Sequence, residues 1–167
     1  MGQPPEHWIA EAYDALGPGL YRHALMILAD PSLAEAAVQQ AFTKLLERRR
    51  MDEVASVQAF LRVVVRNEAY RALARRRKTE ALDDVPARLL ESGDDSVQHH
   101  EEQSQLEQAL RQLAPEQREV VHLKFYEQLT FAQIGELLGI SPNTAASRYR
   151  YALLRLRGLL PAPRMET

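Results

Sequence analysis

The amino-acid sequence predicts an all-α protein, built of two small helical domains that are joined by a flexible acidic linker. Apolar residues recur at helical spacing along most of the chain, and only 7 of the 167 residues are Gly. Charge is also segregated: residues 1–78 carry a net charge of +3, residues 79–104 carry −7, and residues 105–167 carry +2. We therefore expect a first helical domain over 5–78, an acidic linker over 79–104, a second helical domain over 105–160 and a disordered tail over 161–167.

The first domain is expected to contain four helices. They should run over residues 5–16, 19–29, 32–48 and 57–78, with a short connection at 49–55. Gly17-Pro18 should separate the first two helices, because Pro disrupts a helix interior. Ser32 and Glu35 form a capping box that opens the third helix. Ser56 is placed to cap the fourth.

The fourth predicted helix has one strongly basic face. The apolar residues expected to face the core are Phe60, Val63, Val64, Ala69, Leu73 and Ala74. The outer face carries Arg62, Arg66, Asn67, Tyr70, Arg71, Arg75, Arg76, Arg77 and Lys78. Basic side chains with an aromatic among them suit phosphate contacts and base stacking, so this face is a candidate nucleic-acid surface. The alternative is a basic helix end that is simply solvated.

The second domain is expected to begin with two helices. An apolar stripe on the first comprises Leu106, Ala109, Leu110 and Leu113. Pro115 starts the next helix. The residues of that helix available for the core are Val120, Val121, Leu123 and Phe125, whereas His122 is expected at the surface or its boundary.

The stretch from Thr130 to Arg157 has the pattern of a helix-turn-helix. Thr130 and Gln133 form a capping box that opens the first helix. Gly139 suits the left-handed residue that ends a helix, and Ser141 can cap the next one. That second helix carries Arg148, Arg150, Arg155 and Arg157 and has no acid. The second helix of such a motif enters the DNA major groove, so the pattern favours DNA binding over a helical hairpin with a solvated basic face.

Several classes of function are excluded by what the sequence lacks. There are no cysteines, which excludes disulfides, thiol catalysis and Cys-based zinc sites. His99-His100 has no third ligand at helical spacing, so no metal is expected. No Gly-rich phosphate loop or catalytic nucleophile motif appears, and we expect a non-enzyme without cofactor or small-molecule substrate. No apolar run or secretory signal indicates membrane insertion, so a cytoplasmic protein is expected.

Two long stretches carry a resemblance to a known family. The first is LYRHALMILADPSLAEAAVQQAFTKLLE followed by FLRVVVRNEAYRALARRRK, and the second is LAPEQREVVHLKFYEQLTFAQIGELLGISPNTAASRYRYALLRLR. They resemble region 2 and region 4, respectively, of bacterial RNA polymerase sigma factors of the extracytoplasmic-function (ECF) group. The resemblance covers about residues 19–78 and 104–160, which is nearly the whole chain.

The resemblance implies a protein that binds core RNA polymerase and directs it to promoters. Region 2 would dock on the clamp helices of the β′ subunit and melt the −10 element, and region 4 would bind the β flap and read the −35 element. The linker would pass through the template and RNA-exit path. The implied partners are core polymerase, double-stranded promoter DNA, its melted single strand, and an anti-sigma factor, often membrane-attached, that holds the protein inactive.

The resemblance also assigns roles to individual residues. Core polymerase would be bound by Glu35, Gln39, Phe42 and Leu46. The −10 element and its melting would involve Arg62, Arg66, Asn67, Tyr70, Arg71, Arg75 and Arg76. The −35 element would be read by Asn143, Thr144, Ser147, Arg148, Arg150, Tyr151 and Arg155. Arg118 and Lys124 would contact the DNA backbone.

The chain departs from the family pattern at several positions. Ala36 and Gln40 stand where the clamp-facing helix often carries an acid, and Ala146 replaces a usual Lys or Arg of the recognition helix. Arg71 stands where an acid is common. Two other functions stay open at this stage: an autonomous helix-turn-helix regulator that binds its operator as a dimer, and a sigma-like decoy that binds an anti-sigma factor and never DNA.

Overall fold

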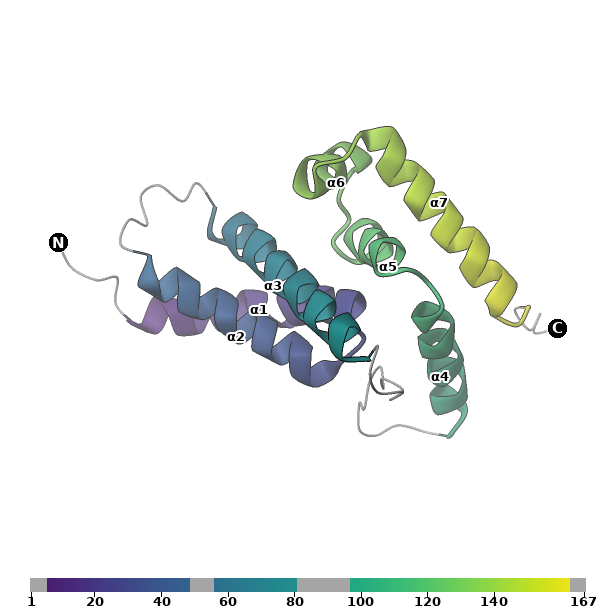
Figure 1. Cartoon of the computed structure of the whole chain (residues 1–167), viewed down its shortest axis with the longest axis horizontal. Helices are drawn as coiled ribbons and strands as arrows, with labels where there is room; N and C mark the ends of the chain where they lie inside the picture. The colour runs from purple at the N-terminus through teal and green to yellow at the C-terminus, as the bar shows by residue number, and fades with distance from the viewer. Residues whose placement is uncertain (1–5, 49–55, 81–96, 163–167) are drawn as a thin grey trace. The chain divides into compact units, whose positions relative to one another are not determined.

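The computed structural model describes residues 6–48, 56–80 and 97–162, and these residues form helices and short turns without any strand (Figure 1). The chain divides into two compact units, unit 1 over Met1–Ala87 and unit 2 over Arg88–Thr167. The all-α prediction is therefore confirmed. The boundary between the units falls within the acidic stretch predicted as a linker, of which residues 81–96 lie outside the described part, as do the connection 49–55 and the last residues of the tail.

Within its described residues, unit 1 consists of three helices that pack against one another in pairs: α1 (Glu6–Leu28), α2 (Pro31–Glu47) and α3 (Val57–Glu80) (Figure 1). Their shared core is closed by buried aliphatic side chains and one aromatic ring. Its largest members are Leu20, Leu25, Ile27, Leu28, Val38, Phe42, Leu45, Leu61, Val65 and Leu73. The three helices share one hydrophobic core. This common core fixes the polar faces of α2 and α3 relative to each other.

The predicted break at Gly17-Pro18 is wrong, because α1 continues through Pro18 as one helix. Proline inside a helix removes one backbone hydrogen bond and costs about 3 kcal/mol in isolation. Residues on both sides of it, such as Leu16 and Leu20, pack on the same core. This tertiary packing outweighs the local cost, and unit 1 therefore has three helices rather than four.

The start of α2 also differs from the prediction. Asp30, not Ser32, is the N-cap, and its Oδ1 accepts a hydrogen bond from the Leu33 N–H at 3.1 Å. Pro31 then takes the first helical position, where its missing N–H is not needed. Ala29 ends α1 with a left-handed φ of 53°. The reversal between α1 and α2 is thus made in two residues.

The cap of α3 is confirmed, but its buried face is shifted from the predicted one. The Ser56 hydroxyl accepts a hydrogen bond from the Ala59 N–H at 3.2 Å. The residues buried on α3 are Leu61, Val65, Ala69, Ala72 and Leu73. Val63, predicted in the core, is 43% exposed. The sequence pattern of α3 is ambiguous because apolar residues surround most of its first two turns.

The described part of unit 2 comprises α4 (Val97–Arg111), α5 (Pro115–Val121), the π-helical turn η2 (His122–Tyr126), α6 (Phe131–Leu138) and α7 (Pro142–Leu159). Helix α4 begins inside the stretch predicted as linker. Two small cores hold the unit together. One contains Ala109, Leu113, Ala152 and Leu156, and the other contains Val120, Leu123, Ile134 and Ala145. Helix α7 contributes to both cores, so its orientation is fixed along its length.

The helix-turn-helix signals are confirmed in detail. Thr130 Oγ1 accepts from the Gln133 N–H at 3.1 Å, and Gln133 Oε1 accepts from the Thr130 N–H at 2.9 Å. Gly139 ends α6 with a φ of 67°. Ser141 Oγ accepts from the Thr144 N–H at 3.1 Å and opens α7. These caps fix the turn between α6 and α7 with local hydrogen bonds.

Candidate nucleic-acid and partner interfaces

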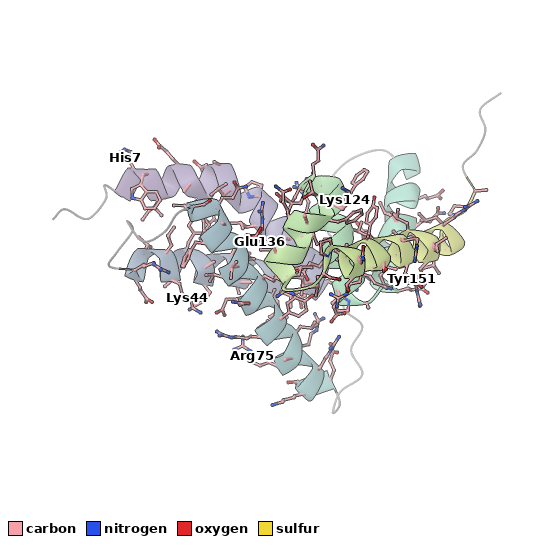
Figure 2. The ribbon with its side chains drawn as sticks, turned by 90° about the horizontal axis from the view of Figure 1, so that it is seen from above. His7, Lys44, Arg75, Lys124, Glu136 and Tyr151 are labelled. Atoms are coloured by element: carbon pink, nitrogen blue, oxygen red, sulfur yellow. The ribbon has the colours of Figure 1, made fainter. Side chains whose placement is uncertain are left out.

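The exposed side of α7 carries the predicted DNA-reading residues in two adjacent stripes. Asn143, Ser147 and Arg150 follow one another at helical spacing and line a groove of about 640 Å³. The rest of the groove is lined by Phe131, Ala146, Tyr149, Leu153, Leu154 and Arg157. The second stripe contains Thr144, Arg148, Tyr151 and Arg155, and Figure 2 shows Tyr151 projecting from the helix.

The N-terminal half of α7 is therefore polar and its groove becomes more apolar toward the C-terminus. Arg150 and Tyr151 lie beside each other, with the guanidinium carbon 5.4 Å from the ring centroid. Leu153 and Leu154 are 43% and 56% exposed. Since helix-turn-helix proteins contact base edges with the first turns of the second helix, the polar half is the part suited to DNA.

Arg118, predicted to contact the DNA backbone, is buried within unit 2. Arg118 is 5% exposed, and its Nη1 donates to the Leu113 carbonyl at 3.0 Å. The same nitrogen lies 3.5 Å from the carbonyl oxygens of Leu110 and Arg111. The Leu110 and Arg111 carbonyls belong to the last turn of α4 and the Leu113 carbonyl follows it, and an arginine can cap such a helix end because helix C-termini carry partial negative charge. Arg118 thus fastens α4 to α5.

Replacing Arg118 with Met is expected to lower the free energy of unfolding of unit 2 by about 1–2 kcal/mol, because buried carbonyls lose their donor. Urea unfolding of the full chain measures this loss. Affinity for duplex DNA per folded molecule should stay the same, measured well below the unfolding midpoint. A DNA affinity that falls while the unfolding curve stays unchanged would restore the original prediction.

Three residues of η2 have a burial that differs from the prediction or make a ring contact that the sequence did not indicate. His122 is buried, and its ring stacks on Tyr126 with centroids 5.7 Å apart. Phe125, predicted in the core, is 74% exposed. The cause is η2: its π-helical hydrogen bonding rotates this segment away from the α-helical register used in the prediction. Lys124 stays partly exposed, with Nζ 4.4 Å from the Phe131 ring centroid.

The basic residues of α3 do not share a single face. At 3.6 residues per turn, Arg66 and Tyr70 lie on one flank, with the guanidinium carbon 4.7 Å from the ring centroid. Arg71 and Arg75 lie on the other flank, and Figure 2 shows Arg75 projecting outward. Asn67 lies exposed between the two flanks. Arg62 and Arg76 are half-buried at the edges of the basic surface.

The predicted partner-binding residues of α2 lie on one face, but Phe42 differs from the others. Glu35 and Gln39 are exposed and lie one turn apart, with Gln39 Nε2 3.5 Å from Glu35 Oε1. Leu46 is 60% exposed. Phe42 is only 5% exposed, and its ring packs 5.0 Å from that of Tyr13. Phe42 therefore belongs mainly to the core, unlike the exposed Glu35, Gln39 and Leu46.

An apolar groove of about 520 Å³ adjoins this face of α2. It is lined by Ile9, Ala10, Tyr13, Asp14, Phe42 and Leu46. Asp14 is the only charged member of this lining, and Tyr13 is 42% exposed. Near the other end of the same face, burial together with the carboxylates of Glu35 and Asp30 raises the pKa of the Tyr21 phenol. The face therefore combines a polar part with an apolar groove.

Comparison with known proteins identifies the family to which the chain belongs. Residues 12–79 match the family model of sigma-70 region 2, and residues 103–156 match that of sigma-70 region 4. The RNA polymerase sigma-E factor of Streptomyces coelicolor is 32% identical over 163 residues, which cover 94% of this chain and 86% of that protein. The chain belongs to the ECF RNA polymerase sigma factors.

This sigma factor has further relatives of the same kind. The ECF RNA polymerase sigma factor SigL of Mycobacterium tuberculosis is 31% identical over 149 residues, covering 87% of this chain and 84% of SigL. As an ECF sigma factor, the protein binds RNA polymerase, directs transcription initiation at promoter DNA and is not an enzyme. The part of the sigma factor that the structure describes holds no helix long and apolar enough to cross a membrane.

The fold of the sigma factor also has a solved counterpart. The sigma factor RpoE of Bartonella quintana, in a crystal structure with the anti-sigma factor NepR, matches with a TM-score of 0.70 and 24% identity. The match covers 93% of this chain and 98% of RpoE. At this identity the likeness establishes the shared fold alone.

Sequence reasoning missed the apolar parts of both candidate surfaces of the sigma factor. Ile9 and Tyr13 lie in the helix predicted over residues 5–16, to which no binding role was assigned. Only the pairing of α1 with α2 leaves them along an open groove beside Leu46. On α7, the helical register of the buried residues Ala152 and Leu156 carries the signal that the leucines between them face outward.

Proposed function

We propose that this sigma factor reads the −35 element with the N-terminal half of α7. The observation that carries the proposal is the stripe of Asn143, Ser147 and Arg150, of which Asn143 and Arg150 are exposed and Ser147 is half-buried, on a capped helix that contains four arginines and no acid. Asparagine and arginine make bidentate contacts with adenine and guanine in the major groove. The arginines that remain on α7 argue against a decoy that never binds DNA.

We propose that α3 faces the −10 element. Arg66 and Tyr70 form a cation–π pair on one flank, which suits stacking of an unpaired base together with phosphate contacts. Asn67, exposed beside them, can hydrogen-bond a base edge. Arg71 and Arg75 on the other flank supply positive charge for the DNA backbone. The two flanks thus divide base contacts from phosphate contacts.

We propose that core polymerase binds the face of α2 that carries Glu35, Gln39 and Leu46, together with the apolar groove beside it. Interfaces are commonly organised as an apolar centre with a polar rim. Leu46 is the most exposed leucine of this face and borders the groove. Gln39 and Glu35 supply the polar contacts, about two and three turns from Leu46.

We also propose that an anti-sigma factor regulates this protein and that it acts in the cytoplasm, where core polymerase and DNA are found. Support comes from RpoE, which was crystallised with the anti-sigma factor NepR. Two units that each carry a DNA surface offer such a partner two surfaces to cover. If the protein directs transcription at its full level in the cells that normally produce it, without any inducing stimulus, this part of the proposal is contradicted.

Replacing Arg150 with Ala is expected to reduce transcription from a cognate promoter by about 10- to 100-fold, since a bidentate arginine contributes roughly 1–3 kcal/mol of discrimination. Run-off transcription with bacterial core polymerase on a fragmented genomic library first identifies the promoters from their shared two-part motif. The Arg150→Ala variant is then assayed on those promoters.

Arg111→Ala is the matched control, because Arg111 is an exposed arginine of the same unit on α4. It removes the same charge and should leave transcription close to the unaltered level. Equal losses from Arg150→Ala and Arg111→Ala would mean that general charge, and not base reading by α7, drives the effect. No new transcripts with the unaltered chain, together with no binding of core polymerase, would contradict the proposal as a whole.

A further inference from the structure

Glu68 is a carboxylate that lies among the basic residues of α3. Glu68 lies on α3, and its side chain is 12% exposed. Its Oε1 lies 2.5 Å from Lys44 Nζ of α2 and 3.2 Å from Arg71 Nη1 of α3. A single oxygen therefore pairs with two cations from two different helices.

We propose that Glu68 limits the sequence-independent affinity of this sigma factor for duplex DNA. The inference rests on the proposed placement of α3 against DNA. Glu68 holds Lys44 and Arg71 in ion pairs, so that these cations are not both available to phosphates. The two cations and one carboxylate act together as a single positive charge.

Non-specific binding to DNA depends on how many cations of the protein are available to neutralise phosphates. Binding of a protein to non-specific duplex DNA is almost entirely electrostatic, and each neutralised phosphate adds about 0.9 to the slope of log affinity against log salt. A cation that is already paired in the protein must lose its partner before it can replace a counterion on DNA. Glu68 thereby removes about one cation from this count.

The arrangement suits a protein that should reach promoters only with its polymerase. A free sigma factor with a long basic helix would otherwise be drawn to any duplex DNA in the cell. The alternative role for Glu68 is to stabilise the contact between α2 and α3. Partly exposed ion pairs contribute little to folding stability, so the two roles predict different measurements.

The test measures binding of the full chain to a fluorescent duplex without promoter sequence, over a series of salt concentrations. Glu68→Gln removes the charge and keeps the side-chain shape. We expect tighter binding and a slope that is steeper by about one unit, so that the affinity lost between 50 and 200 mM salt grows by about threefold. Glu68→Asp, which keeps the charge, should retain the slope of the unaltered protein.

Glu11→Gln is the matched control. Glu11 is an exposed acid on α1, so the variant makes the same change in net charge elsewhere in unit 1. It should change the slope much less than Glu68→Gln. A thermal melt of each variant checks the fold, and Glu68→Met provides a second charge-free variant should Glu68→Gln unfold.

Arg75→Gln separates failure of this inference from failure of the proposed function. Arg75 is an exposed cation on the same flank of α3 as Arg71. Its loss should make the slope shallower by about one unit. If Arg75→Gln leaves the slope unchanged, α3 does not face the DNA and the proposed placement fails. If Arg75→Gln has its effect but both charge-free Glu68 variants match Glu11→Gln, the inference about Glu68 is overturned.

Discussion

Replacing Gly135 with Ala is expected to destabilise unit 2 by about 3 kcal/mol, the upper end of the usual cost of overpacking, and to abolish transcription that depends on the −35 element. Gly135 is buried in α6, and a Cβ at this position would lie 2.6 Å from the Ile140 carbonyl oxygen and 3.3 Å from the Pro142 nitrogen. Both atoms belong to the backbone of the turn that leads into α7. They cannot rotate away, so the two helices would have to separate.

Two other glycines of unit 2 serve as controls for Gly135. At Gly139 a Cβ would meet nothing within 4 Å, but the φ of 67° makes Ala cost about 1–2 kcal/mol. Gly158 lies in the last turn of α7 with open space around it, and Ala there should be neutral or slightly stabilising. Urea unfolding of the three variants measures the order of stability. A Gly135→Ala chain that unfolds like Gly158→Ala would show that the turn can relax around a methyl group.

The helix-turn-helix was predictable because its determinants are local. Thr130, Gln133, Gly139 and Ser141 act on backbone groups within four residues, so their spacing in the sequence already defines the ends of α6 and α7. The close approach at Gly135 was not predictable in this way. It depends on the path of the chain after α6, and a glycine inside a helical pattern has no distinct signal for it.

The features that sequence reasoning got wrong depend on packing between helices. Pro18 reads locally as a helix breaker, but α1 remains continuous because both of its halves pack on one core. Arg118 reads as a surface cation, but it meets the carbonyl groups at the end of α4. The burial of His122 and the exposure of Phe125 follow from the π-helical turn. In each case the residue type and spacing are compatible with two local structures. Only the packing of the helices within the folded unit determines which of the two is adopted.

The same reasoning explains why the candidate surfaces were only partly predictable. The residues of α7 proposed to face DNA lie on one helix, so helical periodicity was enough to group them. The groove beside Leu46 is formed by α1 and α2 together, and no periodicity within either helix reveals it. Pairing across helices likewise brings Lys44 to Glu68, 24 residues apart in the chain.

Replacing Leu46 with Asp is expected to weaken binding of core polymerase by about 30-fold or more, which corresponds to about 2 kcal/mol or more. Leu46 is 60% exposed at the rim of the apolar groove, so the substitution should leave unit 1 folded. In the complex, the carboxylate would lose its water against an apolar surface without a partner. Fluorescence anisotropy of labelled chain titrated with core polymerase measures the change in Kd.

The departures of this chain from its family make Leu46 the more important contact. Ala36 and Gln40 are both neutral, which leaves Glu35 as the acid of α2 among the residues proposed to contact polymerase. With fewer ionic contacts, a larger share of the binding free energy must come from burial of apolar surface, which salt does not screen. The Kd of the unaltered chain should therefore depend only weakly on salt.

Leu106→Asp, which places the same charge at a 43% exposed leucine of α4, is the control and should leave the Kd unchanged. Similar Kd values for Leu46→Asp and Leu106→Asp, or a Kd that rises steeply with salt, would place the polymerase contact on a different and more polar surface.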